Sequence, residues 1–217
     1  GRVDRPGDWD VFRIKGRAGD SIVAEVQARR LDSPLDSLLK ITDAGGKLLA
    51  FNDDRQDAGS GLNTHHADSY LLFKLPADGA YCIHLGETAH TGGTAYAYRL
   101  RISAPQPDFA LRVVPSSVNL RSKNYGSVNV YAIRKDGYTG PITLRLKDGS
   151  PGFSSRPVVL KENQDKTRIT VKTDLKGTAQ PVKLTVEGFM KFQEHEISHE
   201  AVPADDKMQA FLWRHLV

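Results

Sequence analysis

The sequence predicts an all-β protein of two tandem antiparallel β-sandwiches, jelly-roll-like then immunoglobulin-like, with a short C-terminal tail. Short apolar or alternating runs recur at a spacing of roughly eight to twelve residues, and turn signals such as Asp-Gly and Gly-Gly separate them. No long stretch of helical periodicity lies between the runs. An aperiodic stretch with two prolines, residues 103–108, divides them into two series. We therefore expect domains at 1–104 and 105–217, the second including a tail at about 203–217.

The first series begins after a polar N-terminal segment. Its expected strands are residues 10–16, 20–28, 38–51, 69–76, 79–86 and 95–103. The 38–51 segment predicts a hairpin, because the Gly45–Gly46 pair can adopt positive φ at its turn. In 79–86, alternation predicts that Tyr81, Ile83 and Leu85 share one face of the strand and that Cys82 and His84 share the other. Cys82 is the chain's single cysteine, which we interpret as a structural free thiol.

The second series has the same character. Its expected strands are residues 109–115, 127–137, 140–149, 156–163, 166–174 and 180–188. Asp136–Gly137 and Asp148–Gly149 mark turns between strands. The last segment changes period, and Pro203 with the acidic pair after it predicts the start of a short helix in the tail.

Composition excludes several classes of protein. The chain has 217 residues, of which 39% are hydrophobic, and a net charge of +4. Residues 1–105 hold 13 Lys and Arg against 14 Asp and Glu, which leaves the surplus of +5 to the second half. This mild basicity lacks the dense stripe with interleaved aromatic residues that nucleic-acid binding needs. No apolar run is long enough to span a membrane.

A family resemblance rests on four stretches in order: "PGDWDVFRIKGRAGD", "LDSPLDSLLKITDAGGKLLAFNDD", "DSYLLFKLPADGAYCIHL" and "YAYRLRI". With these, residues 1–104 resemble the bacterial pre-peptidase C-terminal domain. The resemblance implies a small, non-catalytic β-sandwich appended to secreted bacterial proteins, often hydrolases. Some related modules bind calcium, collagen or polysaccharide. The second half resembles the sandwich domains that follow such modules in large secreted proteins.

The richest polar stretch is residues 51–70, "FNDDRQDAGSGLNTHHADSY". Calcium takes six to eight oxygen ligands from groups of this kind. We expect such ligands at Asn52, Asp53, Asp54 and Asp68, with Asp36 at the same rim. Two alternatives stay open: Asx-turn and capping hydrogen bonds without metal, and a transition-metal site that uses the histidines at 65 and 66. Asp32 and Asp43 are further candidates for the rim.

Residues 195–199, "HEISH", spell the zinc-protease pattern H-E-x-x-H, in which His195 and His199 would bind zinc and Glu196 would act as base. The pattern works on a helix, yet the sequence around it alternates as a strand does. The third histidine of the extended motif is absent, and Pro203 would end any helix soon after. We therefore interpret it as a polar edge strand or a connection to the tail.

We expect a non-catalytic accessory module of a secreted, periplasmic or cell-surface bacterial protein. It would space, stabilise or target a neighbouring domain, with calcium as a structural ion. The alternative is a module that binds extracellular polysaccharide or matrix protein through an exposed aromatic platform. Its candidates are Trp9, Tyr70, Tyr96 and Tyr98, although the last two share a strand face that favours the core.

Overall fold

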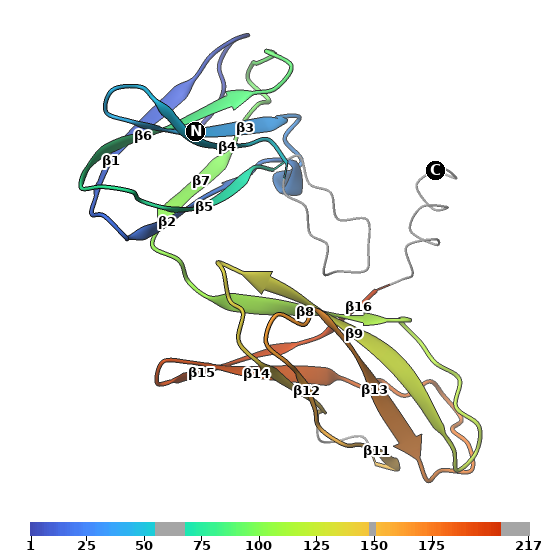
Figure 1. Ribbon diagram of the computed structural model, residues 1–217. Helices are drawn as coiled ribbons and strands as arrows, with labels where there is room; N and C mark the ends of the chain where they lie inside the picture. The colour runs from blue at the N-terminus through green and yellow to red at the C-terminus, as the bar shows by residue number, and fades with distance from the viewer. Residues whose placement is uncertain (55–67, 148–150, 205–217) are drawn as a thin grey trace. The chain divides into compact units, whose positions relative to one another are not determined.

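The computed structural model describes residues 1–54, 68–147 and 151–204, and in these ranges the regular secondary structure is almost entirely strand (Figure 1). It divides into two compact units between Gln106 and Pro107. Each unit holds two sheets around a core of its own. The predicted all-β class and the tandem sandwiches are therefore confirmed. No helix of the described residues is long and apolar enough to cross a membrane.

The described residues of the first unit form seven strands and one short 3₁₀ turn. These are β1 (Asp10–Gly16), β2 (Ser21–Gln27), η1 (Arg29–Leu31), β3 (Ser37–Asp43), β4 (Leu48–Asn52), β5 (Tyr70–Lys74), β6 (Gly79–Glu87) and β7 (Arg99–Ser103). One sheet has the order β1-β6-β3-β4 and the other β5-β2-β7, and every pairing is antiparallel. Consecutive strands change sheet except at the β3–β4 hairpin. Of the Gly45–Gly46 pair predicted to adopt positive φ in that hairpin, Gly46 does so, with φ of 84°, and Gly45 does not.

Alternation places the core of the first unit between its two sheets. On β6, Tyr81, Ile83 and Leu85 are buried, whereas Cys82 and His84 on the opposite face are half-buried. The other sheet contributes Ala24 and Val26 of β2 to the same cluster. A side-chain period of two thus gives one face of each strand to the core, as the sequence predicted.

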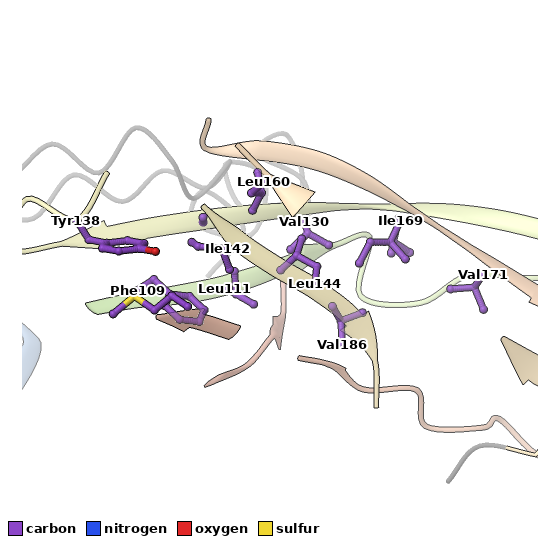
Figure 2. Packing of buried hydrophobic residues seen from close by; sticks show 13 residues of the cluster. Phe109, Leu111, Val130, Tyr138, Ile142, Leu144, Leu160, Ile169, Val171 and Val186 are labelled. Atoms are coloured by element: carbon purple, nitrogen blue, oxygen red, sulfur yellow. The ribbon is translucent and has the colours of Figure 1, made fainter. Parts of the chain in front are cut away.

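In the second unit, nine strands lie within 107–147 and 151–204. These are β8 (Asp108–Val114), β9 (Tyr125–Lys135), β10 (Ile142–Leu146), β11 (Phe153–Ser155), β12 (Val158–Leu160), β13 (Lys166–Thr173), β14 (Val186–Phe192), β15 (His195–Glu200) and β16 (Val202–Pro203). The sheets have the orders β12-β10-β14-β15 and β11-β13-β9-β8-β16. Figure 2 shows the buried side chains packed between the strands, among them Leu111, Val130, Ile142 and Leu144.

Two expectations for the second unit are wrong. The strand predicted at 180–188 begins only at Val186, which lies opposite Leu146, the last residue of its partner β10. Pro203 lies not at the start of a helix but in β16, which pairs parallel with β8 at the sheet edge, where a missing N–H is tolerated. The tail beyond residue 204 and the turn at Asp148–Gly149 lie outside the described residues.

Candidate functional site

The polar centre of the first unit is the buried carboxylate of Asp68, which is 0% exposed. One oxygen, Oδ1, accepts the backbone N–H groups of Ala28 at 2.9 Å and Arg29 at 2.7 Å. The other, Oδ2, accepts the backbone N–H of Arg30 at 3.3 Å and its Nε–H at 2.7 Å. Asp68 therefore holds the turn η1, whose first residues have free N–H groups that need an acceptor.

These contacts change the acidity of Asp68. Burial, the largest single influence, would raise the pKa of the carboxyl group. The side-chain hydrogen bond from Arg30 and the three backbone donors together outweigh burial. The pKa of Asp68 therefore lies below the ordinary value of 3.8, and the group is a carboxylate at neutral pH.

A second buried carboxylate, Glu25 of β2, continues the network. Its Oε1 accepts two guanidinium N–H groups of Arg30 at 3.2 Å, and its Oε2 accepts Arg101 of β7 at 2.8 and 3.1 Å. Arg30 also donates to the backbone carbonyl of Val26 at 2.7 Å. In the described ranges no buried side-chain polar atom lacks a partner. Two carboxylates and two guanidiniums thus compensate one another, as buried charges must.

Hydrogen bonds also fix the residues on either side of the 55–67 segment. The backbone N–H of Ser69 donates to Ser37 Oγ at 2.8 Å, and the two hydroxyls lie 2.9 Å apart. The Oδ1 of Asn52 accepts the backbone N–H of Tyr70 at 2.8 Å, and its Nδ2 donates to the carbonyl of Asp54 at 2.9 Å. The strands β4 and β5 are therefore joined by side-chain bonds, although they belong to different sheets.

The predicted calcium ligands thus fall into two groups. Asp68 and Asn52 direct their oxygens at protein N–H groups. Asp53 is exposed, and Asp54 and Asp36 are half-buried. Among the described residues no three His, Cys, Asp or Glu side chains come together as a metal-binding group. The calcium site stays a prediction, and the histidines at 65 and 66 lie outside the described residues.

Other carboxylates named from the sequence have local roles. Asp43 Oδ1 accepts the N–H groups of Gly45 and Lys47, both at 2.9 Å, which closes an Asx turn in the β3–β4 hairpin. Asp32 ends η1 in the left-handed conformation, with φ of 62°. For Asp43 the structure shows turn bonds of the kind named among the alternatives, and Asp32 contributes its backbone N–H, which donates to the Arg29 carbonyl.

The HEISH pattern lies on strand β15 at the edge of its sheet, as the polar edge-strand interpretation predicted. Residues four apart on a strand are about 13 Å from each other, because each residue advances the chain by about 3.3 Å. His195 and His199 therefore lack the helical spacing with which this motif holds zinc. His199 Nε2 is instead 2.7 Å from Asp108 Oδ1, and its ring contacts Phe109 edge-on.

The four aromatic candidates do not form an exposed platform. Tyr98 is buried, with its hydroxyl donating to Asp10, and the half-buried Tyr96 packs against the same core. The half-buried ring of Trp9 lies close to Gly86, and Lys40 Nζ is 4.1 Å from its centroid. Tyr98 and Tyr96 thus contribute to the core, as their shared strand face indicated.

Sequence reasoning missed three members of the buried network: Glu25, Arg30 and Arg101. A signal for Glu25 was present, because it stands in the otherwise apolar run Ile22–Val26 of β2. A carboxylate in such a run needs a cationic partner when it is buried. Nothing in the local pattern identifies Arg30 or Arg101 as that partner.

Comparison with known proteins gives a partial match. No family model matches the chain. Part of it is 44% identical, over 82 residues, to a probable subtilase-type serine protease of Deinococcus radiodurans, which is 37% of this chain and 10% of the protease. The match thus spans about a tenth of the relative's length. Part of this chain is therefore similar to a small section of a much longer bacterial protein.

Proposed function

We propose that the chain is a non-catalytic accessory region of an exported bacterial protein of the subtilase-type protease kind. The match of 82 residues to one tenth of such a protease carries the proposal. Residues 1–104 would be a domain of the pre-peptidase C-terminal kind, followed by a second sandwich. Their role would be to space, stabilise or target a neighbouring domain.

The structure of each unit supports a mechanical role. Both units have a closed apolar core, and the first also has a compensated network of charges around Asp68 and Glu25. Antiparallel sandwiches of this kind resist deformation, because their cores are close-packed. Among the described residues, the zinc-protease motif lies on a strand and offers no helical histidine pair.

Two experiments test the proposal. The isolated chain is mixed with casein that carries a self-quenched fluorophore, and the fluorescence released by cleavage is expected not to exceed that of a buffer control. In the full-length parent protein, deletion of this region should leave the kcat on a small peptide substrate unchanged and shorten the half-life at elevated temperature. Unchanged half-life with weaker action on a large substrate would instead indicate targeting. Hydrolysis by the chain alone would contradict the proposal.

Calcium stabilisation is part of the proposal for the predicted ligands that the buried network does not use: Asp36, Asp53 and Asp54. An ion that binds only the folded protein raises the free energy of unfolding as its concentration rises. We expect calcium to raise the melting temperature of the chelator-treated chain, and Asp53→Ala to remove the rise. Equal melting temperatures with calcium and with chelator would contradict calcium stabilisation and would mean that hydrogen bonds alone organise this region.

A further inference from the structure

The outward face of the sheet β1-β6-β3-β4 combines cations with exposed apolar side chains. Strand register aligns Val11, His84, Lys40 and Phe51 in one row across the four strands. A second row contains Arg13, Cys82, Thr42 and Leu48. We call these two rows, with Lys15 and Trp9, the outer face. Its apolar members are well exposed: Val11 53%, Leu48 51% and Phe51 62%.

Its charge has a single sign. Arg13, Lys15 and Lys40 face outward, and no Asp or Glu stands at an outward position of these four strands. None of the three cations has an ion pair with a described carboxylate; Lys40 lies over the Trp9 ring instead. Residues 1–105 nevertheless have a net charge of −1, so the carboxylates of this unit are placed elsewhere.

We propose that the outer face is a docking surface for an acidic polypeptide that also carries apolar side chains. Negative groups of the partner would meet Arg13, Lys15 and Lys40, and its apolar groups would cover Val11, Leu48 and Phe51. Complementary charge of this kind selects the partner and speeds association, while apolar burial supplies affinity. The surface does not depend on whether the parent protein is a protease.

Other occupants fit less well. A second copy of the same face would bring cations against cations, which is unfavourable. A polysaccharide would stack on aromatic rings, but the Trp9 ring already packs beside Gly86 and Lys40, which leaves Phe51 as the large exposed aromatic side chain of this face. A polypeptide fits the exposed aliphatic side chains of Val11 and Leu48 better, because its own apolar side chains can cover them and remove both from water.

Trp9 makes the proposal measurable. The chain has two tryptophans, so Trp213→Phe leaves Trp9 as the single emitter within the outer face. We would titrate this variant with a synthetic peptide that repeats Glu-Leu-Asp-Phe. Matched peptides would replace the acidic residues by Lys, or the apolar residues by Ser, and polygalacturonate would represent an acidic polysaccharide. The expected result is binding of the first peptide alone, weakening as salt increases.

Substitutions locate the site. Arg13→Glu with Lys15→Glu, and separately Phe51→Ser, should weaken binding by about tenfold or more, since about 1.4 kcal/mol corresponds to tenfold. The matched control is Leu72→Ser with Lys74→Glu on β5 of the other sheet, both exposed, which should leave binding unchanged. No binding of any probe, or equal losses in the control, would overturn the proposal. Equal binding of polygalacturonate or the Ser peptide would do so as well, by showing a general polyanion site.

Discussion

Replacement of Asp68 by Asn tests the buried network most directly. The carboxylate accepts four N–H groups and is fully buried. Asparagine retains one acceptor oxygen, but its amide group places a donor where Oδ2 received Arg30. Breaking a buried charged pair from one side destabilises proteins by about 3–5 kcal/mol, because the remaining charge stays without compensation. We expect a loss of this size in the free energy of unfolding of the first unit.

The assay is urea unfolding followed by Trp9 emission in a Trp213→Phe background, which reports the first unit alone. The midpoint should fall while the urea dependence, the m-value, stays constant, because the folded surface does not change. With chelator present, so that calcium does not contribute, Asp53→Asn is the matched control: its side chain is exposed, and a change within about 0.5 kcal/mol is expected. A loss below about 1 kcal/mol for Asp68→Asn would refute the reasoning, since water would then be replacing the lost bonds.

The depressed pKa of Asp68 adds a pH dependence with a definite sign. A carboxyl group with a lower pKa in the folded state contributes stability that is fully present above its unfolded pKa, near 3.8. This contribution is lost as pH falls through the lower folded pKa. The stability difference between wild type and Asp68→Asn should therefore be constant at neutral pH and shrink below pH 3.8. A difference that grows on acidification would contradict this assignment.

Three further predictions follow from other contacts. Burial and the hydrogen bond to Asp10 raise the pKa of Tyr98, so its contribution to stability should be present below about pH 10 and lost above it. The Tyr98→Phe variant should not show this loss of stability at alkaline pH when its unfolding in urea is measured. A loss of the same size in the variant would contradict the prediction. Leu39→Ala and Ile142→Ala, each in the core of one unit, should each lower stability by about 2–5 kcal/mol, and only the former should move the Trp9 transition. The chain should retain no zinc after gel filtration, and Glu196→Gln should leave its melting temperature within about 1 °C of wild type; stoichiometric zinc in elemental analysis would count against the strand geometry of β15.

Local alternation predicted the strands well because the two sides of each sheet differ in burial. On β6 the buried Tyr81, Ile83 and Leu85 and the half-buried Cys82 and His84 follow the expected period. Errors arose where a strand is limited by its partner and not by its own pattern. The segment before Val186 alternates, yet β10 ends opposite Val186. Strand β11, Phe153–Ser155, is too short to show a period and was not predicted.

The polar site could be predicted only in part, because its contacts are distant in sequence. The 51–70 stretch predicted Asp68 and Asn52 as calcium ligands, and the structure shows both accepting protein N–H groups. Their partners are not adjacent: Asp68 binds residues 38 to 40 positions earlier, and Glu25 binds Arg101 at a separation of 76. Composition alone does not distinguish metal ligation from N–H acceptance, since both require the same carboxylate oxygens. The N–H groups that Asp68 accepts come from the backbone of η1 and the residue before it, which the local sequence around Asp68 does not identify.

The spacing of the two histidines in the H-E-x-x-H pattern depends on the secondary-structure element in which the pattern lies. On a helix, His195 and His199 would share one face at one turn of separation; on β15 they lie along an outer strand. An edge strand exposes unpaired backbone groups, and charged side chains there discourage association with other chains. Glu200 pairs with Lys147, and Glu187 of the neighbouring strand pairs with Arg145. The charged side chains of HEISHE are therefore typical of a sheet edge, so the position of β15 in the fold accounts for the polar character of this segment.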